Sequence, residues 1–374
     1  MRILSIFGTR PEAIKMAPVI NVLEETDGID SRVCVTAQHR EMLDSVLKVF
    51  KIRADHDLNI MQPNQNLTQI TQAVLGSIGE ILKEEKPARV LVHGDTTTTF
   101  IAALAAFYQK IPVGHVEAGL RTGNNYAPFP EEINRKLTDT LCDLHFAPTQ
   151  TAANNLVQEG IDRSGISITG NTVIDALFYA VESIRSNAEL QSALLDKFPF
   201  LTTERRIILV TGHRRENFGD GFERICNALA KLSERSDLEI VYPVHLNPNV
   251  QEPVQRVLSG RSNVHLLEPL DYLPFVFLMD QCYLVITDSG GIQEEAPSLG
   301  KPVLAMRDVT ERPEAVKIGT VRLVGTDSAA IIKETSVLLD NPDIYAAMSR
   351  IHNPYGDGNA ASRIVQEIRR SHEK

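Results

Sequence analysis

The sequence lacks the features that would place it in several large classes of proteins. Its four cysteines, Cys34, Cys142, Cys226 and Cys282, are widely scattered and form no CxxC pair, so the common cysteine-based zinc and redox motifs are excluded. All except Cys142 lie in apolar strand or helix patterns. We therefore expect buried thiols in a reducing cytosol.

Long apolar runs and an excess of positive charge are also missing. No stretch approaches the ~20 apolar residues of a membrane span, and the start, MRILSIFGTRPE, turns polar too early for a signal peptide. We expect a soluble, cytoplasmic protein with no membrane partner. The net charge of −10 argues against a nucleic-acid partner, although local Arg and Lys side chains can still bind an anionic small molecule.

Several catalytic and cofactor motifs are absent as well. The chain has no GxxxxGK[ST], HExxH or GxSxG segment and no Cys/His spacing typical of a metal site. The segment GDGNAA (356–361) matches GxGxxA, but no predicted strand precedes it, so it is not a dinucleotide fingerprint. No metal site is predicted.

Short apolar runs that alternate with helical patterns fill the 374-residue chain. Strands that are apolar on both faces and separated by helices are typical of parallel sheets built from βαβ units. The predicted strands are 2–7, 32–37, 89–94, 111–116, 143–148, 166–170, 206–213, 238–245, 263–269, 283–290 and 301–306.

The length exceeds a comfortable single core, and the strands fall into two sets. The pattern therefore predicts an α/β protein with two Rossmann-like parallel-sheet domains facing each other across a cleft. We expect an N-terminal domain of residues 1–170 plus 360–374, whose last helix packs back on it, and a C-terminal domain of residues 171–359.

Open α/β sheets bind ligands beyond the carboxyl ends of their strands, so the residues that follow each strand are candidates for a functional site. After the first strand, GTRPEAIK contains Arg10 and Lys15, two cations suited to an anionic ligand. The alternative is that Arg10 pairs with Glu12 and that Lys15 is a solvated helix residue.

Three carboxylates follow strands or begin a helix in the first half of the chain. Asp95 and Glu117 end two strands that are expected to be neighbours, and Glu131 begins a helix that can join them. Three acids without a metal site are suited to proton transfer, and their mutual repulsion would raise at least one pKa. In isolation, Asp95 is better explained as a helix N-cap.

In the second half, DSGGIQEE (288–295) joins a strand to a helix, where backbone N–H groups can hold a diphosphate. Glu295 lies within reach of ribose hydroxyls; the alternative is a tight turn capped by Ser289. His213 in TGHRREN is a phosphate donor or a partner of backbone carbonyls. Arg312 in TERPE is a ligand cation or half of a surface ion pair.

These segments together resemble the non-hydrolysing UDP-N-acetylglucosamine 2-epimerases. The resemblance spans nearly the whole chain and rests on the segments GTRPEAIKMAP, TAQHREML, HGDTTTT, GHVEAGLRTG, PEEINR, GNTVIDAL, TGHRREN, HLNPNV, DSGGIQEEAPSLGKPVL, RDVTERPEA and NPYGDG. It implies the glycosyltransferase-B type fold and the interconversion of UDP-GlcNAc and UDP-ManNAc without NAD or metal. The implied mechanism eliminates UDP to give a 2-acetamidoglucal and then adds UDP back.

The resemblance also assigns residues and partners. It implies catalytic roles for Asp95, Glu117, Glu131 and His213, and contacts to the nucleotide sugar for Arg10, Lys15, Phe275, Ser289, Gly290, Gly291, Glu295 and Arg312. Gln38, His39 and Arg40 match a regulatory site of bacterial relatives, but Glu41 follows where some relatives have Gln. Glu132 is left as a helix N-terminal charge.

A homodimer, and a product that supplies ManNAc units for surface polysaccharide, are expected from the same resemblance. Three alternatives remain open: a hydrolysing epimerase, a UDP-sugar glycosyltransferase of the same fold, and a non-catalytic nucleotide-sugar sensor. The sensor reading is the weakest of the three, because all three acids are present.

Overall fold

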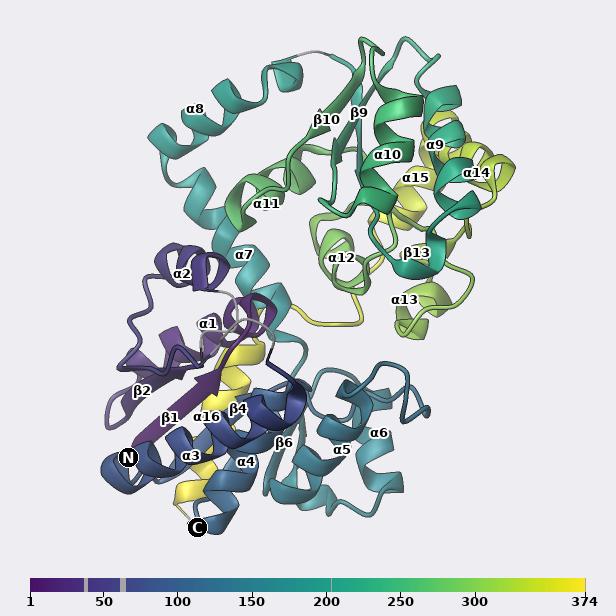
Figure 1. Cartoon of the computed structure of the whole chain (residues 1–374). Helices are drawn as coiled ribbons and strands as arrows, with labels where there is room; N and C mark the ends of the chain where they lie inside the picture. Colours follow the sequence, from purple (N-terminus) through teal and green to yellow (C-terminus); the bar gives the residue numbers. More distant parts are fainter. Residues whose placement is uncertain (37–39, 61–64, 203, 374) are drawn as a thin grey trace. The chain divides into compact units, whose positions relative to one another are not determined.

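The computed structural model of the chain describes residues 1–36, 40–60, 65–202 and 204–373. The chain forms two compact units, Met1–Tyr179 with Tyr355–Lys374, and Ala180–Pro354 (Figure 1). Each unit is an α/β layer structure around one parallel sheet, so the predicted fold class is confirmed. The expectation that the two domains face each other across a cleft stays a prediction.

The first unit contains a seven-stranded sheet in the order β3-β2-β1-β4-β5-β6-β7 among the described residues. Its strands are β1 (Arg2–Phe7), β2 (Asp30–Val35), β3 (His56–Asp57), β4 (Arg89–His93), β5 (Val113–Val116), β6 (Leu144–Ala147) and β7 (Ile166–Ile168). Its helices are α1 (Arg10–Glu24), α2 (Arg40–Val49), α3 (Leu67–Glu85), α4 (Thr97–Tyr108), α5 (Glu131–Leu141), α6 (Gln150–Gln158) and α16 (Ala360–His372), with a 3₁₀ turn at Arg163–Gly165.

The second unit contains a six-stranded sheet in the order β10-β9-β8-β11-β12-β13 within the described ranges. Its strands are β8 (Arg206–Thr211), β9 (Leu238–Pro243), β10 (Val264–Leu267), β11 (Leu284–Thr287), β12 (Val303–Ala305) and β13 (Val321–Leu323). Its helices are α8 (Ala188–Lys197), α9 (Asp220–Leu232), α10 (Pro248–Leu258), α11 (Tyr272–Gln281), α12 (Gly290–Glu295), α13 (Pro313–Ile318), α14 (Ser328–Asp340) and α15 (Pro342–Ser349). Short 3₁₀ turns lie at Pro199–Thr202, Arg215–Asn217 and Ala296–Leu299.

Helix α7 (Thr172–Arg185) carries the chain from the first unit into the second. The chain returns before α16, which contacts α1 in the first unit and appears in yellow beside it in Figure 1. The last helix thus belongs to the first compact unit. No helix within the described ranges is both long and apolar enough to cross a membrane.

Every predicted strand range overlaps a strand of the structure, because a strand buried on both faces needs a continuous apolar run. Strand β1 shows the pattern: five of its residues are fully enclosed and only Arg2 reaches the surface. Strands β3 and β13 were not predicted. They have two and three residues, too few to produce a recognisable pattern.

Candidate active site

The carboxyl edge of the first sheet brings together most of the residues predicted there. Strands β1, β4 and β5 are consecutive in the sheet and parallel, so the segments after them leave from one edge. Arg10 and Lys15 lie on α1 after β1, Asp95 follows β4, and Glu117 follows β5. Glu131 is the first residue of α5 and is partly exposed.

Glu117 is held from two sides in a strained backbone conformation. Its φ of 66° lies in the left-handed region, which non-glycine residues rarely adopt and which is often found at functional sites. Its carboxylate accepts hydrogen bonds from Nζ of Lys15 and, at 2.9 Å, from Nδ2 of Asn171. The alternative of a solvated Lys15 is wrong, because its ammonium group is mostly enclosed in this pair.

His93 is a further member of this cluster that the sequence analysis missed. It ends β4, is buried, and places Nε2 3.7 Å from Oε2 of Glu117. Neither of its ring nitrogens has a hydrogen-bond partner among the described residues. Buried polar atoms are normally paired, so such an orphan beside a strained carboxylate marks this edge as functional.

Asp95 is oriented by α5 and does not cap the helix that follows it. Its carboxylate pairs with the guanidinium of Arg135, and its carbonyl oxygen accepts a hydrogen bond of 2.9 Å from Nδ2 of Asn134. The N-cap of α4 is Thr96, whose hydroxyl accepts from the backbone N–H of Thr99. The N-cap interpretation of Asp95 is therefore wrong.

Glu132 is more than a helix N-terminal charge, which corrects the prediction. Its side chain is fully buried and accepts hydrogen bonds from the backbone N–H groups of Thr122 and Gly123 at 3.1–3.2 Å and from Arg135 at 3.0 Å. The carboxylate thus fixes the loop after β5 to α5. It also holds Arg135, the partner of Asp95.

Glu12 is likewise committed to the fold. Its buried carboxylate accepts hydrogen bonds from the backbone N–H groups of Gly8 and Thr9 and from the hydroxyls of Thr96 and Thr99. The described residues contain no ion pair between Glu12 and Arg10, so that alternative is wrong. Arg10 stays partly exposed at the start of α1.

The carboxyl edge of the second sheet is organised by Asp288, a fully buried residue that follows β11. Its Oδ2 accepts from the backbone N–H groups of His213 and Arg214 at 2.9 Å and from Nδ2 of Asn217 at 3.2 Å. The guanidinium of Arg214 returns a hydrogen bond of 2.9 Å to the Asp288 carbonyl. One carboxylate therefore fixes the ends of the neighbouring strands β8 and β11.

His213 projects from this anchored loop with 46% of its side chain exposed. Its ring stacks on that of His245 with 5.5 Å between centroids, and its Nδ1 lies 3.5 Å from Oδ1 of Asp288. Partial burial lowers the pKa of His213, Asp288 opposes this shift in part, and the neighbouring His245 and Arg214 add smaller contributions that lower the pKa further. The ring is therefore neutral at pH 7.

The segment from Ser289 to Gly291 does not behave as a simple capped turn. The side chain of Ser289 makes no capping hydrogen bond to α12, and neither Gly290 nor Gly291 has a positive φ. A Cβ on either glycine would meet its nearest neighbour only at 3.7–3.8 Å, so the protein itself has room for a side chain there. Glycine at both positions instead favours close approach of a ligand to the backbone.

Arg312 is the N-cap residue of α13 and is tied to α12. Its guanidinium pairs with the buried carboxylate of Glu294, and its backbone N–H donates to Thr310 at 3.1 Å. Thr310 in turn donates to Oε1 of Gln293 at 2.7 Å. The alternative of a surface ion pair is wrong, because Glu294 is only 1% exposed.

The remaining predicted residues are placed as follows. Glu295 ends α12, and Phe275 lies partly buried on α11. Gln38 and His39 lie outside the described residues, and so does the side chain of Arg40, the first residue of α2. The regulatory site therefore stays a prediction.

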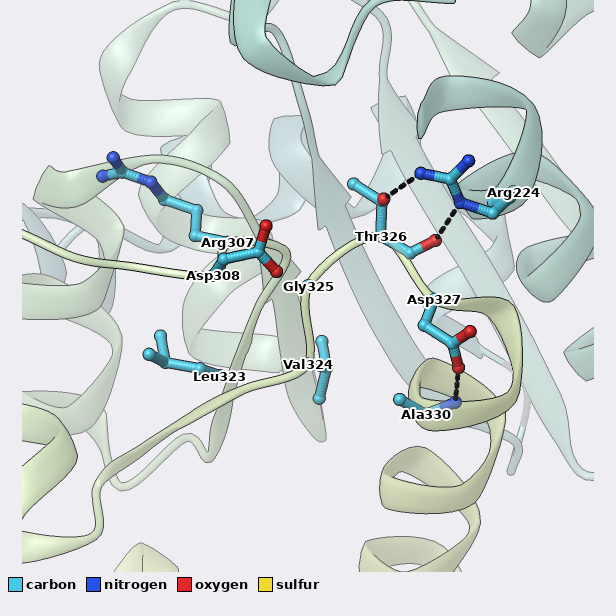
Figure 2. Close-up of a pocket in the computed structure, with 9 residues that line it drawn as sticks. All are labelled: Arg224, Arg307, Asp308, Leu323, Val324, Gly325, Thr326, Asp327 and Ala330. Carbon is cyan, nitrogen blue, oxygen red and sulfur yellow. Dashed lines mark hydrogen bonds between the residues drawn. The ribbon is translucent and has the colours of Figure 1, made fainter. Parts of the chain in front are cut away.

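A separate pocket of roughly 530 Å³ lies in the second unit, beyond the ends of β12 and β13. Figure 2 shows its polar wall, where Arg224 donates to the hydroxyl and carbonyl oxygens of Thr326 and Asp327 accepts from the backbone N–H of Ala330. None of the predicted site residues lines it. The described parts of the chain contain no group of three or more His, Cys, Asp or Glu residues arranged to hold a metal ion.

Comparisons with known proteins identify the family of the chain. A family model for UDP-N-acetylglucosamine 2-epimerase matches residues 21–369. The UDP-N-acetylglucosamine 2-epimerase of Escherichia coli (strain K12) is 60% identical over 370 residues, which cover 99% of this chain and 98% of that protein.

Solved structures extend the likeness to the fold. The crystal structure of UDP-GlcNAc 2-epimerase from Neisseria meningitidis bound to UDP-GlcNAc has a TM-score of 0.92 at 54% identity, over 99% of this chain and 100% of that chain. The Methanocaldococcus jannaschii enzyme in complex with UDP-GlcNAc and UDP has a TM-score of 0.80 at 34% identity, over 99% of each chain.

Proposed function

The chain belongs to the UDP-N-acetylglucosamine 2-epimerase family, and from this premise we propose that it interconverts UDP-GlcNAc and UDP-ManNAc by moving the proton at C2 of the sugar. The observation that carries the proposal is the pair of carboxylates on neighbouring strand ends. Asp95 and Glu117 are each oriented by a cation, Arg135 and Lys15. Oriented carboxylates are suited to general acid–base catalysis.

In the proposed reaction a carboxylate removes the proton from C2 while the bond from C1 to the diphosphate breaks. UDP leaves with the bonding electrons, and a 2-acetamidoglucal remains. An acid then protonates C2 from the opposite face, and UDP adds back to C1. The two steps balance without an oxidant, a reductant or water. Asp95, Glu117 and Glu131 are the proposed acids and bases, with no assignment of one carboxylate to one face.

The second sheet edge supplies the proposed diphosphate and nucleotide contacts. Gly290 and Gly291 leave room for a ligand to approach the backbone closely, and Ser289 precedes them with a side chain that makes no capping hydrogen bond. His213 projects from a rigid loop, and Arg312 is fixed by Glu294, so both are oriented before a ligand binds. Fixed donors stabilise the charge that develops on the leaving diphosphate. Arg10, Phe275 and Glu295 complete the proposed contacts.

One labelling experiment tests this proposal against its rivals. Purified protein in D₂O that receives only UDP-GlcNAc is expected to form UDP-ManNAc with deuterium at C2, detected by NMR and mass spectrometry. Release of free ManNAc would instead indicate a hydrolysing epimerase. A requirement for an acceptor would indicate a glycosyltransferase, and binding without turnover would indicate a sensor.

We further propose that the chain forms a homodimer in the cytoplasm. Helices α4 and α5 contact each other in the first unit and expose the large apolar side chains of Phe107, Tyr108 and Leu137. Large apolar side chains exposed on two packed helices suit a subunit interface. Light scattering is expected to give twice the 41.4 kDa chain mass, and Leu137→Glu is expected to lower it. The described cysteines are free thiols, which suits the reducing compartment proposed here. We also propose that the product supplies ManNAc units for surface polysaccharide.

A further inference from the structure

His115 occupies the centre of a buried polar cluster in the first unit that the proposed chemistry does not use. Its side chain is fully enclosed in β5. Nδ1 lies 2.6 Å from Oδ1 of Asp139 on α5, and Nε2 lies 2.8 Å from the carbonyl oxygen of Gly94, which follows β4. Both distances are those of good hydrogen bonds.

Both partners of the His115 ring accept hydrogen bonds and cannot donate them. A backbone carbonyl has no proton to give, and Asp139 accepts a second hydrogen bond, 2.6 Å from Arg121, on its other oxygen. Burial alone raises the pKa of Asp139, but His115 and Arg121 outweigh it and hold that pKa below its usual range. With an ionised Asp139, both ring nitrogens of His115 must carry a proton.

The charged groups around the ring agree with an imidazolium. Arg121 also pairs with Glu159 at 2.6 Å, so one guanidinium stands between the two carboxylates of Asp139 and Glu159. His145, the register partner of His115 on β6, donates to the Asp139 carbonyl at 2.8 Å, and burial lowers its pKa. Burial raises the pKa of Cys142 well above its ordinary value. His145 and Cys142 are therefore neutral neighbours.

The three segments that meet at this ring carry the three proposed catalytic acids. Gly94 immediately precedes Asp95, and His115 stands two residues before Glu117 on the same strand end. Asp139 lies on α5, the helix that begins at Glu131. The His115 ring thus links the backbone before Asp95 to α5, the helix that begins with Glu131.

We propose that His115 is a positioning residue for this acid set, held as an imidazolium that fixes the Gly94 carbonyl, and with it Asp95, against α5. The proposal rests on the proposed epimerase function. If the ring lost one proton, a nitrogen lone pair would face either the carbonyl oxygen or the carboxylate at hydrogen-bond distance. The repulsion would displace the segment before Asp95 and leave the nucleotide contacts of the second unit unchanged.

The first test measures the ring itself and does not depend on any activity. Neutron diffraction on crystals of the deuterium-exchanged protein at pH 8 is expected to show deuterium on both Nδ1 and Nε2 of His115. Deuterium on only one nitrogen would overturn the proposal. A doubly protonated ring in a protein that fails the D₂O labelling test would leave the geometry intact and refute the epimerase function alone.

The second test separates positioning from stability. His115→Gln cannot donate to both acceptors, so kcat is expected to fall about 10- to 100-fold, because misplacement of a catalytic group by about 1 Å costs roughly 100-fold. KM for UDP-GlcNAc should change less than about twofold. The kcat of the wild type is expected to decline at alkaline pH, and this decline should be absent from the variant.

His145→Gln is the matched control, because it removes the neighbouring histidine on β6 without touching Gly94. It is expected to lower the melting temperature and to keep the wild-type pH profile of kcat. An unchanged kcat and pH profile in His115→Gln would overturn the proposal, as would an equal change of the pH profile in both variants. If His115→Gln does not fold, the diffraction result on the wild type decides.

Discussion

The two sheet edges have opposite arrangements of charge. At the first edge the carboxylates of Asp95 and Glu117 stand at the site and are oriented by cations of the fold, such as Lys15 on α1. At the second edge His213 and Arg312 belong to the proposed site, and the buried carboxylates of Asp288 and Glu294 lie next to them. Both edges follow the same βαβ rule, yet the first presents carboxylates, whereas the second presents a neutral histidine and an arginine cation.

This inversion indicates a division of labour. Carboxylates can exchange protons with a sugar, and held in one orientation they are suited to chemistry. Cations and open backbone N–H groups attract a diphosphate and do not need to change protonation state to hold it. Asp288 and Glu294 are both almost fully enclosed, so the second edge gains its geometry from carboxylates that are themselves shielded from solvent.

The largest expected effect is the loss of chemistry at the first edge without loss of binding at the second. Glu117→Gln should lower kcat by about three orders of magnitude, within the range attributed to general acid–base groups. The affinity for UDP, measured by calorimetry, should change less than about twofold, because its proposed contacts lie mainly in the second unit. Glu80→Gln, an exposed carboxylate on α3, is the matched control. Near-normal turnover in Glu117→Gln would remove Glu117 from the mechanism.

The second prediction concerns the ion pair between Arg312 and the buried carboxylate of Glu294. Arg312→Ala leaves Glu294 buried without this partner, and breaking a buried pair typically costs about 3–5 kcal/mol of stability. It should also weaken UDP binding about 10- to 100-fold, the equivalent of one charge-assisted hydrogen bond.

The double variant Arg312→Ala with Glu294→Gln separates the two effects. Urea unfolding should show that stability largely recovers, because the buried charge is gone, while calorimetry shows UDP binding still weak. Recovery of binding together with stability would mean that Arg312 serves only the fold.

Strand periodicity is the signal from which the positions of the site residues at the two sheet edges could be predicted. Apolar runs located the strands, and the parallel-sheet rule then placed Asp95, Glu117 and His213 at carboxyl edges before any coordinates were known. The partners of these residues were not predictable, because Arg135 is 40 residues from Asp95 in the sequence and meets it only through packing.

The sequence also could not distinguish the roles of neighbouring residues with similar chemistry. Glu131 and Glu132 are the same residue type at adjacent positions. In the structure, the helical rotation of α5 directs Glu132 toward the loop after β5 and leaves Glu131 partly exposed. Asp95 and Thr96 are both good N-cap residues, and the backbone selects Thr96. Which of two neighbouring residues caps a helix or faces a loop depends on the exact residue at which the helix begins. Sequence patterns are least informative about such boundaries.

The third prediction tests how the first edge is held. Glu132→Gln replaces a buried carboxylate that accepts from two backbone N–H groups and Arg135. The amide has one acceptor atom fewer, so a buried donor is left unpaired at a cost of about 1–3 kcal/mol. Urea unfolding should show this loss for Glu132→Gln, whereas Glu131→Gln should change stability by less than about 0.5 kcal/mol. Equal losses would contradict the assignment of Glu132 to the loop.

The smallest expected effect is a pH dependence of binding at the second edge. Burial lowers the pKa of His213, so its ring is neutral at pH 7 and gains charge only as the pH falls below 6.5. The gained cation should strengthen binding of UDP-GlcNAc, whose two phosphates are diesters and keep a constant charge over this range. Affinity measured by calorimetry should therefore rise a few-fold, about 1 kcal/mol or less, between pH 7.5 and pH 5.5.

His213→Gln should abolish this rise and His245→Gln should preserve it, although the loss of the His245 charge lets His213 gain its proton at a somewhat higher pH. The groups that face the ring are Asp288, His245 and Arg214. If affinity falls on acidification in the wild type, His213 does not face the diphosphate. The cation at the second edge would then be supplied by arginine alone.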